Sequence, residues 1–156
     1  MNWQTIHTEV FFVIEKDTIK MLRECDAGIR MGVESINDVI DSVEDKSFKN
    51  SLLECKTAHE KLGDELRASL DRFGDKGKKP NAFAKGMSKI KTDFMLSTKK
   101  SDRTVADLMT DGCNMGVKSL SRYLNQYSAA DEDSKDIAKR LISLEEELAV
   151  NIRRFL

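Results

Sequence analysis

The chain has 156 residues, the size of one ordinary domain, and a formal net charge of −1 from 26 basic and 27 acidic side chains. This balance gives no general attraction to nucleic acid or to an anionic membrane, so we expect neither as a partner. The longest apolar run, residues 10–14, is too short to span a bilayer. The three cysteines are odd in number and far apart, which indicates free thiols in a reducing compartment and predicts a cytoplasmic protein.

A single all-α domain is predicted over residues 1–156, divided into an apolar extension (1–16), a helical hairpin (17–74), a basic crossover (75–103) and a second hairpin (104–156). Between residues 17 and 43, apolar side chains recur in steps of three and four, as on the buried face of a helix in a bundle. Asp17 stands where an N-cap is expected, so the first helix is predicted to begin there.

The second helix is predicted from Ser47 to Gly74, with Phe48, His59 and Phe73 on its buried face and the glycine as its stop. Loop residues follow at 75–80. Four apolar residues of the crossover then recur at helical spacing and predict a short amphipathic helix: Phe83, Met87, Ile90 and Phe94.

The second hairpin begins after Ser101, and its first helix is expected to run to about Tyr127. The acidic stretch that starts at Asp131 favours a helix N-terminus, because acidic side chains stabilise the first turn. The last helix then carries its apolar face from Ile137 to Phe155.

An internal repeat relates the two hairpins at an offset of 84 residues. Residues 28–36 and 112–120 share both glycines, a methionine, a valine and a serine at the same places. The glycines are Gly28, Gly32, Gly112 and Gly116. Each costs about 1 kcal/mol relative to alanine inside a helix, so a packing reason is required. We therefore predict that they lie where the first and third helices cross closely.

Two hairpins joined by a long crossover, with residues 112–120 and the Tyr-Leu-Asn-Gln-Tyr sequence at 123–127, resemble a bacterial branch of the ferritin-like four-helix-bundle superfamily. The resemblance implies two metal ions, held by one glutamate from each of the first and third helices and a Glu-x-x-His from each of the others. This chain contains no Glu-x-x-His, since Lys56 lies three residues before His59, and Ile29 and Cys113 occupy would-be glutamate positions. We expect no cofactor and no catalytic residue.

His59 is the strongest remaining candidate for a residual single-metal site. It falls on the apolar face of its helix, and Asp26, Glu54 and Cys113 are the other candidate ligands. The alternative, which the scarcity of ligands favours, is a core histidine that bonds a neighbouring side chain or a water.

The crossover holds eight lysines between residues 76 and 100 against one acid, Asp93. A basic amphipathic helix can bind anionic lipid or nucleic acid. The interpretation we prefer is that its apolar face covers the bundle while lysines such as Lys85 and Lys89 remain solvated.

Residues 3–14 are more apolar than one helix face requires. They either extend the first helix beneath the crossover or form a surface for a partner, and a homo-oligomer is the preferred partner. Three functional hypotheses remain open: a non-catalytic structural or interaction protein, which we favour; an atypical metal-binding or oxidoreductase protein using His59 and nearby carboxylates, including those at 145–147; and a small-ligand binder in the bundle core.

Overall fold

A computed structural model describes residues 2–78, 91, 92 and 94–156, and this part of the chain is helical with no strand. The predicted residues Phe83, Lys85, Met87, Lys89 and Ile90 lie outside the described residues. Its elements are α1 (Trp3–Val39), the 3-10 turn η1 (Ile40–Ser42), α2 (Lys46–Asp71), α4 (Asp102–Gln126), α5 (Glu132–Ile152) and the 3-10 turn η2 (Arg153–Phe155).

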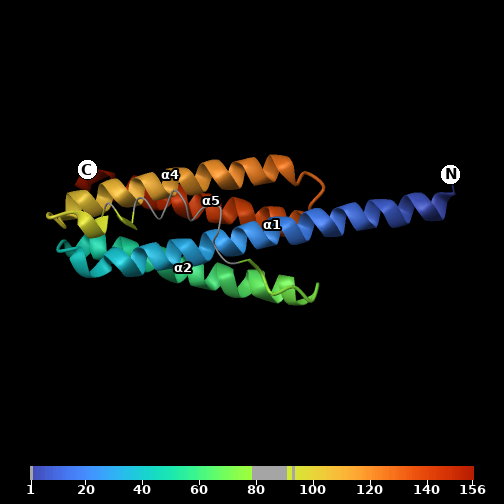
Figure 1. Ribbon diagram of the computed structural model, residues 1–156, viewed down its shortest axis with the longest axis horizontal. Helices are drawn as coiled ribbons and strands as arrows, with labels where there is room; N and C mark the ends of the chain where they lie inside the picture. The colour runs from blue at the N-terminus through green and yellow to red at the C-terminus, as the bar shows by residue number, and fades with distance from the viewer. Residues whose placement is uncertain (1, 79–90, 93) are drawn as a thin grey trace.

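The four long helices pack side by side, and α1 extends well beyond the others at its N-terminal end (Figure 1). Helix α1 packs against α2, α4 and α5, and α5 packs against α2 and α4. Helix α4 runs antiparallel to α1 and in the same direction as α2 (Figure 1). Among the described residues, no helix combines the length and the apolar character needed to cross a membrane.

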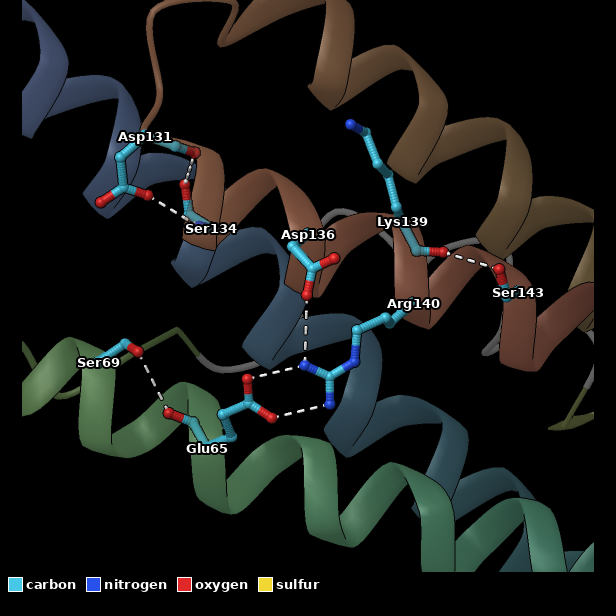
Figure 2. Close-up of polar contacts among 8 residues, drawn as sticks. All are labelled: Glu65, Ser69, Asp131, Ser134, Asp136, Lys139, Arg140 and Ser143. Atoms are coloured by element: carbon cyan, nitrogen blue, oxygen red, sulfur yellow. Dashed lines mark hydrogen bonds and ion pairs between the residues drawn. The ribbon is translucent and has the colours of Figure 1, made fainter.

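Polar caps fix where three of these helices begin. Asp45 accepts a hydrogen bond from the backbone N–H of Phe48 at 2.9 Å at the start of α2, and Ser101 caps α4 through its hydroxyl. Asp131 accepts from the backbone N–H of Ser134 at 2.8 Å and caps α5 (Figure 2). Each cap satisfies an N–H group that has no partner inside its own helix.

The prediction that the first helix begins at Asp17 is wrong. Helix α1 begins at Trp3, and Asp17 lies inside it. The Asp17 carboxylate instead accepts a hydrogen bond from the backbone N–H of Ala129, 3.2 Å away in the α4–α5 connection. A capping residue ends a helix only where the preceding backbone leaves the helical conformation, and the preceding residues contain neither proline nor glycine to cause this.

The predicted end of the second helix is also late. Helix α2 ends at Asp71, and Gly74 adopts φ +64° in the turn that follows. Phe73 therefore lies beyond the helix and is 36 % exposed rather than buried. The glycine is needed in the left-handed turn, three residues past the last helical residue.

The core is divided into two apolar clusters along the bundle axis. One contains Phe48, Leu52, Val105 and Leu148, near the end where α2 and α4 begin. The other contains Met21, Leu22, Leu66 and Leu141, toward the opposite end. Phe94 of the crossover belongs to the first cluster and is only 3 % exposed. At Phe94, the crossover therefore covers the bundle core as expected.

A bidentate ion pair joins α2 to α5 at the surface. Both terminal nitrogens of Arg140 donate to the Glu65 carboxylate at 2.8 Å, and Asp136 accepts a longer contact of 3.4 Å (Figure 2). Arg140 and Glu65 are each about half exposed, at 48 % and 49 %. Exposed ion pairs contribute only about 0–1 kcal/mol, so the packing of α2 against α5 is stabilised mainly by buried apolar side chains.

Candidate functional site

A polar layer separates the two apolar clusters at the middle of the bundle. It takes one residue from each long helix: Gly32 of α1, His59 of α2, Gly116 of α4 and Glu145 of α5. His59 is 1 % exposed and the side chain of Glu145 is 13 % exposed. This buried titratable pair lies between the two apolar clusters, which marks the layer as the candidate site.

Both ring nitrogens of His59 have hydrogen-bond partners. Nδ1 lies 2.9 Å from the backbone carbonyl oxygen of Cys55, which can only accept, so Nδ1 carries a proton. Nε2 lies 2.9 Å from Oε1 of Glu145. The Cys55 sulfur lies 3.4 Å from Nδ1. Because Nδ1 already donates to the carbonyl, it cannot act as a base toward the Cys55 thiol.

The surroundings favour an imidazolium–carboxylate pair. Burial lowers the pKa of His59, but its hydrogen bonds to Cys55 and Glu145 and the Glu145 charge outweigh this effect and raise the pKa to about 10. Burial and the nearby Glu145 carboxylate raise the pKa of the neighbouring Cys113 thiol. At neutral pH His59 is therefore charged and Cys113 is a protonated thiol, so the layer offers neither a general base on His59 nor a thiolate at Cys113.

The two glycines of the layer make room for this pair. A Cβ on Gly32 would lie 2.9 Å from Cδ2 of His59, closer than side-chain carbons normally approach. A Cβ on Gly116 would lie 3.4 Å from Cδ of Glu145. The sequence predicted these glycines at a close crossing of α1 and α4. At Gly32 and Gly116 the nearest groups are instead side chains from α2 and α5, so the glycines make room for His59 and Glu145.

The repeated glycines also line a cavity between α1 and α4. Gly28, Gly32, Gly112 and Gly116 contribute to its walls, and Glu145 reaches it from α5. Its volume is about 40 Å³, enough for a few atoms or waters but too small for a typical organic cofactor. The glycine stripe thus leaves a narrow, mainly apolar space that ends at the polar layer.

Asp26 does not join His59, contrary to the expectation that the two could share a metal. Its fully buried carboxylate pairs with Arg30 at 3.0 Å and accepts a hydrogen bond from the backbone N–H of Lys78 at 3.1 Å. Gly77 lies so close that a side chain there would collide with the Asp26 carboxylate. Asp26 therefore anchors the start of the crossover onto α1.

Glu54 is likewise away from His59. It is exposed and lines a separate hollow of about 210 Å³ between α2 and α5, together with Glu147. Of the candidate ligands, the structure brings Glu145 directly to His59 and places Cys113 beside Glu145. Within the described part of the chain, no three His, Cys, Asp or Glu side chains are grouped so as to hold a metal ion.

Sequence reasoning considered Glu145 only as one of three adjacent carboxylates. In the structure the three carboxylates have different surroundings: Glu145 points into the polar layer, whereas Glu146 and Glu147 are exposed. The signal that could have found it is its spacing: Glu145 lies four residues after Leu141 and three before Leu148, and both leucines are buried.

Comparisons with known proteins leave the site without an assigned role: no family model, no curated protein and no solved structure matches the chain.

Proposed function

We propose that this chain is a non-catalytic member of the ferritin-like bundles that assembles with a second copy of itself through the N-terminal part of α1. The observation that carries the proposal is the exposed apolar character of residues 3–14, which project beyond the rest of the bundle (Figure 1). The pairing of helix directions in the bundle supports the ferritin-like part of the proposal.

The polar layer supports a role without a di-metal centre. In the metal-bearing members implied by the resemblance, four carboxylates and two histidines converge at the core. Here the corresponding level contains one histidine and one carboxylate, and these two bond each other at 2.9 Å. Glycines occupy the other two helices at this level. A buried pair of this kind can specify how helices align, because sliding one helix would leave a charge unpaired.

The projecting part of α1 is apolar on more than one face. Trp3 is 78 % exposed, Phe11 is 70 % exposed and Phe12 is 67 % exposed. The other exposed apolar residues of this segment are Ile6, Val10, Val13 and Ile14. A helix that is apolar on all sides is normally buried, so this segment is expected to be covered in the working protein.

A second copy of the chain is the occupant that the segment fits best. Trp3, Ile6, Val10 and Val13 follow the alternating steps of three and four that let two helices pack together. Apart from His7, Glu9 is the only ionisable side chain between residues 3 and 14, so like charges do little to oppose self-association. The low charge also provides no electrostatic complement for a strongly basic or acidic partner.

The test is the mass of the full chain in solution by sedimentation equilibrium. The wild type should be a dimer or larger at micromolar concentration, and the double variant Ile6→Ser with Val10→Ser, on the stripe argued to pair, should be a monomer with unchanged helix content. The matched control replaces Leu53 and Val150, which are 44 % and 57 % exposed on α2 and α5, by serine and should assemble like the wild type.

A monomeric wild type up to about 100 μM would contradict the proposal. A membrane role would appear as co-sedimentation of the monomer with phosphatidylcholine vesicles and its loss in the Ile6/Val10 variant. Equal dissociation of the control and the test variant would show that the interface lies elsewhere on the bundle.

A further inference from the structure

Sulfur-bearing side chains gather around the cavity between α1 and α4. Met31, Met109, Cys113 and Met115 all line it. The described residues include five methionines, and three of them are at this cavity. The cluster therefore brings three thioethers and a thiol from two helices to one small space.

We propose that this cavity is a binding site for a soft monovalent cation, Cu⁺. Thioether and thiolate sulfurs are the soft ligands that favour Cu⁺ over harder ions. Zinc instead takes cysteine, histidine and carboxylate ligands, and a group of three such residues is absent from the described part of the chain. The proposal goes beyond self-assembly, because the cavity lies in the bundle and not on the projecting segment.

The burial of the cluster suits a site that shields an easily oxidised ion. Met31, Met109 and Cys113 are 9 %, 7 % and 2 % exposed, whereas Met115 is half-buried. The space of about 40 Å³ accommodates one ion with little room for more. Glu145 also lines the cavity, with its Oε2 3.6 Å from where a Cβ on Gly116 would lie and its Oε1 bonded to His59.

Binding is a ligand exchange without a redox step. The copper stays Cu⁺, and the three methionines bind through neutral sulfur lone pairs. If Cys113 also binds, its S–H bond breaks, an S–Cu bond forms and the proton passes to water.

The competing explanation is that the methionines only fill gaps, which their flexible side chains do well in many cores. The two explanations differ in one measurable property. A gap-filling methionine can be replaced by leucine, of similar volume, with little change in stability and no change in copper affinity. A ligand cannot, because leucine has no sulfur.

The experiment is an anaerobic competition of the full reduced chain against a chromophoric Cu⁺ chelator. The wild type should remove one Cu⁺ per chain. Met31→Leu and Met109→Leu should each weaken the affinity about tenfold or more. The matched control is Met21→Leu, since Met21 is fully buried but outside the cavity. X-ray absorption of the copper-loaded protein should show sulfur as the principal scatterer.

Failure to remove copper from the chelator would overturn the proposal. So would unchanged affinity in the triple leucine variant at positions 31, 109 and 115, because the copper would then be bound by other thiols. Cys25→Ser and Cys55→Ser identify that case, since each should leave the affinity unchanged if the cavity binds the ion. Melting curves and helix content establish that every variant compared is folded.

Discussion

The projecting part of α1 is richer in apolar residues than the packed part, yet the two have opposite surroundings. From Thr18 to Val39 the helix packs against α2, α4 and α5, and its large side chains such as Leu22 are almost fully buried. From Trp3 to Ile14 the same unbroken helix carries exposed aromatic side chains. Helix formation is therefore not what distinguishes the two parts. Burial of a helix depends on the helices packed against it. Within the described chain, α2, α4 and α5 bury only the part of α1 from Thr18 to Val39.

The largest effect is expected in the packed part, at Gly32. Leucine at this position would press on His59, because its Cβ alone would lie 2.9 Å from Cδ2. Displacing the ring would leave Glu145 buried without its partner, so the free energy of unfolding should fall by about 3–5 kcal/mol despite the better helix propensity of leucine. Urea denaturation measures the change.

Gly28→Ala is the control for Gly32→Leu. The nearest atom to a Cβ there is Cδ2 of Leu141 at an ordinary 3.6 Å. This variant should keep the stability of the wild type or gain up to about 1 kcal/mol from helix propensity. A raised melting temperature in Gly32→Leu would show that the polar layer adapts freely and that the glycine is not needed.

Phe94→Ala sharpens the comparison by removing a buried side chain that lies outside the four long helices. Phe94 is 3 % exposed and packs in the cluster around Phe48 and Val105. Its removal should lower the free energy of unfolding by about 3 kcal/mol, through lost apolar burial and the cavity left behind. Leu96→Ala, at a residue that is 76 % exposed, should change stability by at most about 0.5 kcal/mol. Equal effects of the two substitutions would contradict the burial of Phe94.

A smaller effect, visible as a dependence on pH, is expected from His59. Its pKa is raised from 6.5 to about 10 in the folded protein, so the folded state holds the proton more tightly than the unfolded chain. The stabilisation is fully present below about pH 6.5 and is lost as the pH rises through 10. The free energy of unfolding should thus decline between pH 7 and 10 more steeply in the wild type than in His59→Gln.

His7→Gln is the control for this pH dependence, because His7 is exposed in the projecting part of α1. It should retain the steep decline of the wild type. Parallel curves for the wild type and His59→Gln would mean that the buried pair does not hold its proton more tightly in the folded state.

The smallest effect on folding is expected in the projecting part of α1. Phe11→Ala should change the free energy of unfolding by no more than about 0.5 kcal/mol when measured below the concentration at which chains associate, because the side chain is 70 % exposed. Leu22→Ala, in the packed part of the same helix, should cost about 2–5 kcal/mol. A large loss at Phe11 in dilute protein would show that the segment folds back onto its own bundle.

Periodicity in the sequence predicted the long helices well where a cap or a turn marks their ends. Asp45, Ser101 and Asp131 cap helices near the predicted starts. The prediction of a helix start at Asp17 was wrong, because a capping aspartate and a mid-helix aspartate that bonds another segment look alike in sequence. The repeated glycines predicted a packing constraint between α1 and α4. At Gly32 the constraint comes instead from the His59 ring of α2.

By itself, the sequence determined the all-helical class, the buried faces of the helices and the need for space at Gly32 and Gly116, because these follow from residue spacing and local conformational cost. Only the tertiary structure decided which groups meet. Cys55 is four residues from His59 and local in sequence, but Glu145 is 86 residues away. Such a pairing depends on how α2 and α5 align along the bundle axis. A single sequence does not specify that alignment, since a shift of one turn preserves the apolar pattern while replacing every partner.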